Sequence, residues 1–551
     1  MASLFYPKKW RFTWEAQSHI PTLRLLLFDS HTNPSIQCRN LEIHLDPSRS
    51  SVIVSWFEDS QVSLSIPIPR VLVDTESPVI FRALEDHIEV KLVLLLPVDH
   101  PIVSSFDSAL NLSEDQENAF TKPLVMDSDV KILSSEGGVD FYCRSCSFKL
   151  TRSPIRYFIE MPSVDWREVA DNWFGACCCS FGGISEKLVV QYANSYRCAQ
   201  SKCLLSSTSI TLCKDDVVDY NFCKSDGHQE YNSVPNMIGD DDFSNIKTNS
   251  EGNQLQATNC CDPSGDILAS DESSRFAHAE NENLSANLDS GVSKEKFNHD
   301  GLSPLPSYLD ISEDVALAHD CCRQEKGPTT TIEVLANQKS FLNGFLGNVF
   351  MVRSSYLSED IEWFEFLCPQ CSSLLGAYPC AKGCAPVDGG VRFFKCYIST
   401  CLPVGGSGDL FRKYTMERMF ANQLMESAND ESSFRTVVRD LKTSSLVLQI
   451  VLINPDSWSC TGYCAGTKDP IEVVPKINLH PVVKVLFSDS RSGTESQSRM
   501  IEDWTTKNMA DEVFMLASQM EELMESLTSR KCIYPPSYAS LQGLSLSSMP
   551  R

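Results

Sequence analysis

The chain has 551 residues, a formal net charge of −25 and 42% hydrophobic residues, which allows two or three domains with cores of their own. The acidic excess argues against direct binding to nucleic acid or to a membrane surface, because both need basic patches that replace counterions. No apolar run reaches the roughly 20 residues that span a bilayer, and the N-terminus shows no signal peptide. We therefore expect a cytoplasmic protein, present also in the nucleus, whose partners are other proteins.

Residues 1–204 predict a mainly-β N-terminal domain. Short segments of β-branched and alternating apolar residues recur between turn-like segments; they lie at Trp10–Trp14, Leu23–Phe28, Ser51–Phe57, Val62–Ile66, His87–Leu96 and Ile155–Met161. Further on, Asp165 can cap a short helix that carries Trp166 and Trp173 on one face. Repeated short strands without long helical patterns favour a sandwich or an open barrel.

Residues 205–335 differ in composition, with Ser, Asp, Asn and Glu dominating, as in Gly239–Phe243. No apolar periodicity persists, and too little apolar surface is available to offset the entropy of ordering the chain. We therefore predict a long disordered acidic insertion over 205–335.

Residues 336–535 predict a C-terminal α+β domain, and residues 536–551 a tail. The expected strands are Gly390–Ile398, Leu446–Ile453 and Pro481–Phe487, with a turn at Asn454–Asp456 after the second. Apolar residues at helical spacing predict helices over Leu410–Ser427 and Asn508–Lys531. The fold class is thus mixed β and α+β, with two domains separated by the insertion.

Two Cys-x-x-Cys pairs give the strongest functional signal: Cys143 with Cys146, and Cys368 with Cys371. Two thiolates in a tight turn can face one point, and two such knuckles supply the four soft ligands of a tetrahedral zinc ion. Strands rather than a helix follow both pairs, which disfavours a thioredoxin-like role. We expect a structural zinc site that joins the two domains, with buried or redox-active cysteines as the alternative.

The other cysteines carry weaker signals. The total of 23 is odd and several are adjacent, which suits a disulfide framework poorly and a reducing compartment well. Cys380 with Cys384, and Cys460 with Cys464, have metal-like spacing but no partner pair. We interpret these four as loop cysteines, with a second metal site as the alternative.

The consecutive Cys177, Cys178 and Cys179 lie in a glycine-flanked segment after Trp173. Successive side chains diverge, so three consecutive thiols cannot all enter one core, and at least one is expected to reach solvent. Such a thiol can act as a nucleophile or donate a sulfur ligand to a metal held by a partner. Zinc ligation within this protein, or packing beside Trp173, is the alternative.

The order of these motifs resembles the HECT-like E2-binding family, whose members are described as E3 ubiquitin-protein ligases. The resemblance rests on Phe-Tyr-Cys-x-x-Cys, then Pro-Ser-x-x-Trp, then a Trp before adjacent cysteines, then Cys-x-x-Cys with Leu-Gly behind it. The residues that carry it are Phe141, Tyr142, Cys143, Cys146, Pro162, Ser163, Trp166, Trp173, Cys178, Cys179, Cys368, Cys371, Leu375 and Gly376. The acidic insertion lies outside the resemblance and is similar to what plant members carry.

The resemblance implies binding of a ubiquitin-loaded E2 enzyme and transfer of ubiquitin to lysines. HECT chemistry needs a cysteine that accepts ubiquitin as a thioester, and Cys178 and Cys179 are the candidates. The chain departs from a HECT ligase, which carries its nucleophile near the end of a bilobal domain. Cys532 stands near the end here without that context, and no set of eight ligands forms a RING.

The resemblance also implies a second role. In this family the Trp-then-Cys-Cys stretch resembles a motif that enters the metal site of an RNA 3'-end-processing endonuclease of the metallo-β-lactamase type. An exposed thiolate can occupy an open zinc position and hold such an enzyme inactive. On this reading Trp173 and Cys177–Cys179 bind a partner, and the protein is a non-enzymatic chaperone or inhibitor.

Overall fold

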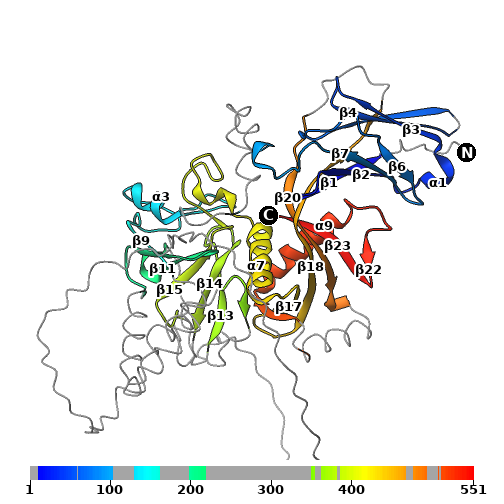
Figure 1. Ribbon diagram of the computed structural model, residues 1–551. Coiled ribbons are helices and arrows are strands. Elements are labelled where there is room, and N and C mark those ends of the chain that lie inside the picture. Colours follow the sequence, from blue (N-terminus) through cyan, green and yellow to red (C-terminus); the bar gives the residue numbers. More distant parts are fainter. Residues whose placement is uncertain are drawn as a thin grey trace, which may run out of the picture. The chain divides into compact units, whose positions relative to one another are not determined.

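Strands dominate the computed structural model of the protein (Figure 1). The structure describes residues 10–58, 60–103, 124, 129–161, 196, 198–218, 349–353, 361–380, 385–466, 476–492, 507 and 510–551. All of them belong to one compact unit, which draws on residues 1–227 and 327–551. Of the predicted acidic insertion, everything except residues 205–218 lies outside the described residues, as do Trp166, Trp173 and Cys177–Cys179.

The largest sheet has eleven strands and is built from both ends of the chain. Its main path runs, in order, through β12 (Val352–Arg353), β21 (Asp511–Met515), β17 (Arg435–Asp440), β18 (Leu446–Tyr463), β1 (Arg11–Gln17), β2 (Thr22–Phe28), β7 (Ile88–Val93) and β6 (Ile80–Ala83). Off this path, β20 pairs with β18 and β23, and β23 pairs with β22; their bounds are β20 (His480–Asp489), β22 (Ser540–Leu541) and β23 (Leu544–Pro550).

Strand β18 is 18 residues long, and it therefore pairs with strands from both ends of the chain. Its first half pairs with β17, and its second half pairs with β1, where Arg11 lies opposite Tyr463. The predicted turn at Asn454–Asp456 is wrong, since the strand continues through it with register shifts against β20. Pro455 lacks an amide donor, and a bulge is where a strand accommodates such a residue.

Three smaller sheets complete the β structure. A six-stranded sheet runs through β13 (Glu362–Leu367), β14 (Leu374–Cys380), β15 (Gly390–Phe394), β11 (Ser209–Cys213), β10 (Lys202–Leu205) and β9 (Tyr157–Glu160). A four-stranded sheet runs through β19 (Ala465–Gly466), β5 (Gln61–Pro67), β4 (Ser51–Phe57) and β3 (Arg39–Asp46), and a two-stranded sheet pairs β16 (Ile398–Ser399) with β8 (Tyr142–Cys143). The strands predicted in residues 1–161 are confirmed within a few residues at their ends.

The described helices are few. Two short ones are α1 (Pro34–Gln37) and α3 (Asp129–Ser135), and the two long ones are α7 (Met416–Glu431) and α9 (Ala517–Lys531). Helices α7 and α9 contact each other and β23, and their apolar faces enter a core that also holds residues of β18, β20 and the six-stranded sheet. A second core lies between strands β1, β2 and β7 and strands β3–β5. No described helix combines the length and apolar character needed to cross a membrane.

The predicted start of the insertion at residue 205 does not match the structure. Strand β11 lies inside the predicted insertion of 205–335, where all five of its residues, Ser209–Cys213, are buried. It pairs with β15 of the predicted C-terminal domain, as β1 pairs with β18. The predicted domains of 1–204 and 336–535 therefore share sheets and a core, because strand pairing joins segments far apart in the sequence.

Two predictions near the C-terminus are also wrong. The predicted helix of Asn508–Lys531 begins only at Ala517, because Asp511–Met515 form strand β21, which pairs in parallel with β17. Val513 and Met515 are buried on this strand, so the steps of four and three residues from Met509 to Val513 and from Val513 to Leu516, which predicted the helix, were coincidental. The predicted tail of 536–551 contains β23, whose Met549 is fully buried against the helices.

Candidate metal centre

The two Cys-x-x-Cys pairs meet although 221 residues separate them. The Sγ atoms of Cys143, Cys146, Cys368 and Cys371 all lie within 4.8 Å of one another. Cys143 Sγ lies 3.7 Å from Cys371 Sγ, and Cys146 Sγ lies 3.6 Å from Cys368 Sγ. These distances are far longer than the roughly 2.05 Å of a disulfide bond.

The two knuckles have the same backbone geometry. In the first, the amide of Cys143 donates to the carbonyl of Phe148 at 2.8 Å, and the amide of Ser147 donates back to Cys143 at 2.9 Å. In the second, Cys368 and Ser373 form the equivalent 2.8 Å bond, and Ser372 donates to Cys368 at 2.9 Å. Ser147 and Ser372 both have positive φ, 62° and 59°, which turns the chain so that both sulfurs of each pair face inward.

The sulfur positions fit a tetrahedral metal ion. Zn–S bonds of about 2.3 Å at tetrahedral angles place sulfur atoms about 3.8 Å apart, close to the observed 3.6 and 3.7 Å. Backbone amides of Ser145 and Cys146 donate to Cys143 Sγ, and those of Phe148 and Ser373 donate to Cys146 Sγ and Cys371 Sγ. These hydrogen bonds stabilise thiolates, the form that binds metal.

The four thiols differ in their environment. Burial raises the pKa of Cys143, and burial also raises that of Cys146. Hydrogen bonds from the hydroxyl and the amide of Ser373 lower the pKa of the exposed Cys371 to about 6. A divalent cation would offset the repulsion among the sulfurs and replace the protons of the buried thiols. Because all four donors are cysteines, the site is closed, as in structural metal sites.

Arg144, between the two cysteines of the first knuckle, fixes that knuckle to the rest of the fold. Its guanidinium donates to the carbonyl oxygens of Tyr414 and Phe411, both at 2.7 Å. It also reaches those of Ile398 at 3.1 Å and Lys395 at 3.3 Å. Burial lowers the pKa of this guanidinium. The sequence did not predict this role of Arg144, because its flanking residues give no sign that its side chain binds four carbonyls distant in the chain.

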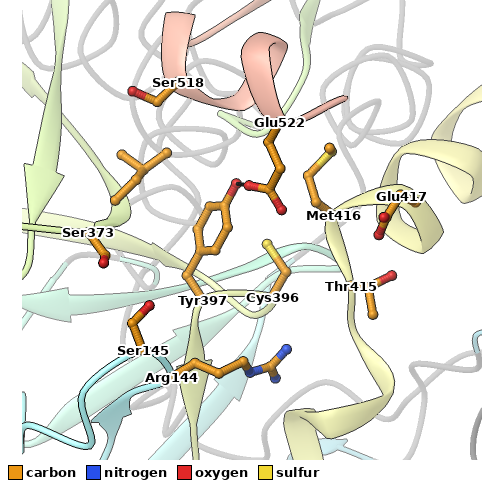
Figure 2. A pocket seen from close by; sticks show the side chains of 11 residues that line it. Arg144, Ser145, Ser373, Cys396, Tyr397, Thr415, Met416, Glu417, Ser518 and Glu522 are labelled. Atoms are coloured by element: carbon orange, nitrogen blue, oxygen red, sulfur yellow. Dashed lines mark hydrogen bonds between the residues drawn. The ribbon is translucent and has the colours of Figure 1, made fainter. Parts of the chain in front are cut away.

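A cavity of about 480 Å³ adjoins both knuckles through Ser145 and Ser373. In Figure 2, Tyr397 points toward Glu522 of α9, and Thr415, Met416 and Glu417 come from the start of α7. The Tyr397 hydroxyl donates to Glu522 at 2.6 Å. Burial raises the pKa of Tyr397, and burial also raises that of Glu522.

Among the described cysteines outside the four, none has the features of an activated nucleophile. Burial raises the thiol pKa of seven of them: Cys198, Cys203, Cys213, Cys396, Cys401, Cys460 and Cys464. A protonated, buried thiol reacts slowly. Cys532 is exposed at the end of α9, where its Sγ lies 3.0 Å from the carbonyl of Ser529.

The wider cysteine pairs do not form a metal site within the described residues. Cys460 lies on β18, and Cys464 follows that strand. Four residues of extended chain span about 13 Å, so these two thiols cannot share an ion, and both pack against the second core. Cys380 is buried at the end of β14, with its thiol donating to Ala385 at 3.3 Å, and Cys384 lies outside the described residues.

The fold and the site define a mainly-β protein with a cluster of four cysteines, assembled from both halves of the chain, that could hold a metal ion. The family described as HECT-like ubiquitin-conjugating enzyme (E2)-binding matches residues 15–296 and 319–546. The match covers most of the chain, so the protein belongs to this family, as the motif order predicted. No curated protein and no solved structure matches it.

Proposed function

We propose that the protein is an E3 ubiquitin-protein ligase-like factor that binds a ubiquitin-loaded E2 enzyme and promotes ubiquitin transfer to substrate lysines. Membership of an E2-binding family across most of the chain is the observation that carries the proposal. In this proposal Cys143, Cys146, Cys368 and Cys371 hold zinc, and the ion has a structural role because a four-cysteine shell leaves no position for a substrate.

In this proposal the protein accelerates the discharge of the E2 without forming a thioester on the described cysteines. The buried thiols have raised pKa values, which supports a role in which the protein orients the E2–ubiquitin thioester toward a lysine amine. A thioester route would instead need Cys178 or Cys179, which lie outside the described residues.

Single-turnover discharge of a panel of ubiquitin-charged E2 enzymes tests the proposal. The full-length protein should speed the loss of the E2 thioester with at least one E2, and free lysine should accept the ubiquitin. A non-reducing gel, run on wild type, on Cys178→Ala/Cys179→Ala and on the exposed control Cys532→Ala, separates the two routes. If the protein accelerates discharge of no E2 in the panel, the proposed ligase function is ruled out.

Metal content tests the zinc proposal separately. Purified wild-type protein should contain one zinc per chain, and single Cys→Ser variants at Cys143 and Cys368 should both lose it. The variant Cys460→Ser is the matched control, because its thiol packs in an apolar core away from the four cysteines. Zinc retained after the loss of one knuckle would rule out a shared site.

The second candidate function is a non-enzymatic partner of a metallo-β-lactamase-type RNA 3'-end-processing endonuclease. The sequence Trp173 followed by Cys177–Cys179 favours it, and an exposed thiolate is a good ligand for an open zinc position. Co-purification of the endonuclease with the full-length protein tests this function. Binding that is unchanged in Cys178→Ala/Cys179→Ala would argue against it, and this function predicts no E2 discharge.

A further inference from the structure

A charged cavity of about 410 Å³ lies on the large sheet, on strands that carry none of the four metal-site cysteines. Its lining includes the cations Arg24, Arg82, Lys91 and Lys484 and the carboxylates of Glu15 and Glu89. Four cations minus two carboxylates leave an excess of two positive charges. The whole chain has 47 basic against 72 acidic residues, so the lining of this cavity is positively charged in a protein that is acidic as a whole.

Strand pairing concentrates the excess charge on strands β2, β7 and β6. Arg24 lies directly opposite Lys91, and Arg82 lies directly opposite Glu89. The carboxylate of Glu89, which is only 2% exposed, forms ion pairs with all three cations. It lies 2.6 Å from Arg24 and 3.8 Å from Lys91, and it also pairs with Arg82. Lys484 is instead paired with Glu15, at 2.5 Å.

The opposed Arg24 and Lys91 are the clearest sign of an anionic ligand. Like charges on directly opposite residues of neighbouring strands destabilise a sheet, and one carboxylate cannot neutralise three cations. Arg82 and Lys91 are 59% and 45% exposed, so their charged groups can reach a ligand. Ser457 adds a neutral donor: it is 3% exposed and lines the cavity, and its hydroxyl has no partner among the described residues.

The spread of the cations indicates the size of the ligand. Adjacent strands lie about 4.8 Å apart, and Arg82 is two residues along β6 from Ile80, the residue opposite Lys91, so the backbone positions of Arg24 on β2 and Arg82 on β6 are about 12 Å apart. The buried carboxylate of Glu89 already contacts both Arg24 and Arg82, so a ligand has to bring further negative charge to the outer sides of these cations. An extended acidic peptide can offer more than one carboxylate, because its alternate side chains stand about 6.6 Å apart along the chain. Ala16 and Ile20, which also line the cavity, offer apolar surface to the same peptide.

We propose that this cavity is a docking site for an extended acidic segment of a partner protein, whose carboxylates bind Arg24, Lys91 and Arg82. The site is independent of the metal centre, and the proposal does not rest on the ubiquitin-ligase function. Binding is electrostatic and is therefore weakened by salt.

Fluorescence anisotropy of a labelled hexaglutamate peptide, titrated with the full-length protein, tests the proposal. The peptide should bind at low salt despite the net charge of −25, and raising the salt should release it. The variant Arg82→Gln/Lys91→Gln should bind about tenfold more weakly, as expected for the loss of two partly exposed charge contacts. The control Lys442→Gln removes an exposed lysine from the turn after β17 and should leave the affinity unchanged.

Three outcomes would overturn the proposal: no peptide binding at low salt, unchanged affinity in the double variant, or inorganic phosphate binding as tightly as the peptide, which would indicate a single-anion site. A thermal unfolding midpoint equal to that of wild type shows that the double variant is folded. The single variant Lys91→Gln keeps the ion pair between Arg82 and Glu89, and should weaken binding by a smaller factor.

Discussion

At the scale of single residues, Arg144 connects the candidate metal centre to the core. It stands between Cys143 and Cys146, and its guanidinium donates to four carbonyls of the segment 395–414. These carbonyls belong to the chain around β16 and to the turn before α7. Hydrogen bonds from a charged donor contribute about 1.5–3 kcal/mol each when measured singly, and a buried acceptor left without one is costly.

The substitution Arg144→Ala should therefore lower the free energy of unfolding by about 3 kcal/mol or more. It should also weaken metal binding, because the first knuckle loses its attachment to the core. Urea denaturation and a metal-chelator competition measure the two effects. The control Arg39→Ala, at an exposed position on β3, should change stability by less than about 0.5 kcal/mol. Equal effects of the two substitutions would contradict the role of Arg144.

Metal uptake should release protons from the buried thiols. Without metal, the raised pKa values keep Cys143 and Cys146 protonated at pH 7, whereas Cys371, with a pKa of about 6, is already a thiolate. Zinc binding at pH 7 should then release about two protons or more, and the affinity should fall as the pH is lowered, because protons compete for the sulfurs. Calorimetric titration in buffers of different ionisation enthalpy counts the protons. A count of zero would contradict this assignment.

At the scale of elements, β23 is a buried strand whose short sequence pattern did not predict it. The segment Leu544–Pro550 alternates weakly and was predicted as a tail, yet it pairs along β20 and supports both α7 and α9. Its Met549 is fully buried in the main core, whereas Leu541 of the neighbouring β22 is 57% exposed. Position near a chain end therefore says little about burial.

Truncation of Met549 to alanine should lower the free energy of unfolding by about 2–5 kcal/mol, because it leaves a cavity beneath the helices. The matched substitution Leu541→Ala should change it by less than about 0.5 kcal/mol. Chemical denaturation followed by circular dichroism measures both. If Met549→Ala proves as mild as Leu541→Ala, β23 does not contribute to the core in solution.

The elements that sequence patterns predicted well are those whose burial is local. Strands β4 and β5 follow from alternating apolar residues between turn residues, and the two knuckles follow from cysteine spacing alone. The parts that the sequence concealed depend on distant partners. Nothing local indicates that β11 pairs with β15, or that Val513 lies on a strand instead of a helix, since those choices are made by the neighbouring strand. The cavity beside the knuckles was hidden for the same reason.

At the scale of the whole molecule, the four cysteines come from two halves of the chain that also share their sheets. The sequence suggested that the metal would join two separate domains. Instead, β1 pairs with β18 and β11 pairs with β15, so both halves contribute strands to the two largest sheets. The main core likewise takes residues from both halves, including Phe141 and Phe411, whose rings stack with centroids 6.0 Å apart.

This interleaving predicts how fragments of the chain behave. Residues 1–218 and residues 349–551 should each fail to fold when expressed alone, because each lacks half of the cysteine ligands and the partner strands of its own sheets. Co-expressed in the presence of zinc, they should form a one-to-one complex that unfolds cooperatively and carries the metal, because strand pairing and metal binding both favour association. Size-exclusion chromatography, metal analysis and thermal denaturation test this.

The matched control is the co-expressed pair with Cys143→Ser, which should assemble less stably and without metal. A fragment of residues 1–218 that unfolds cooperatively by itself would show instead that the N-terminal half is an independent domain and that the shared strands form only after it has folded.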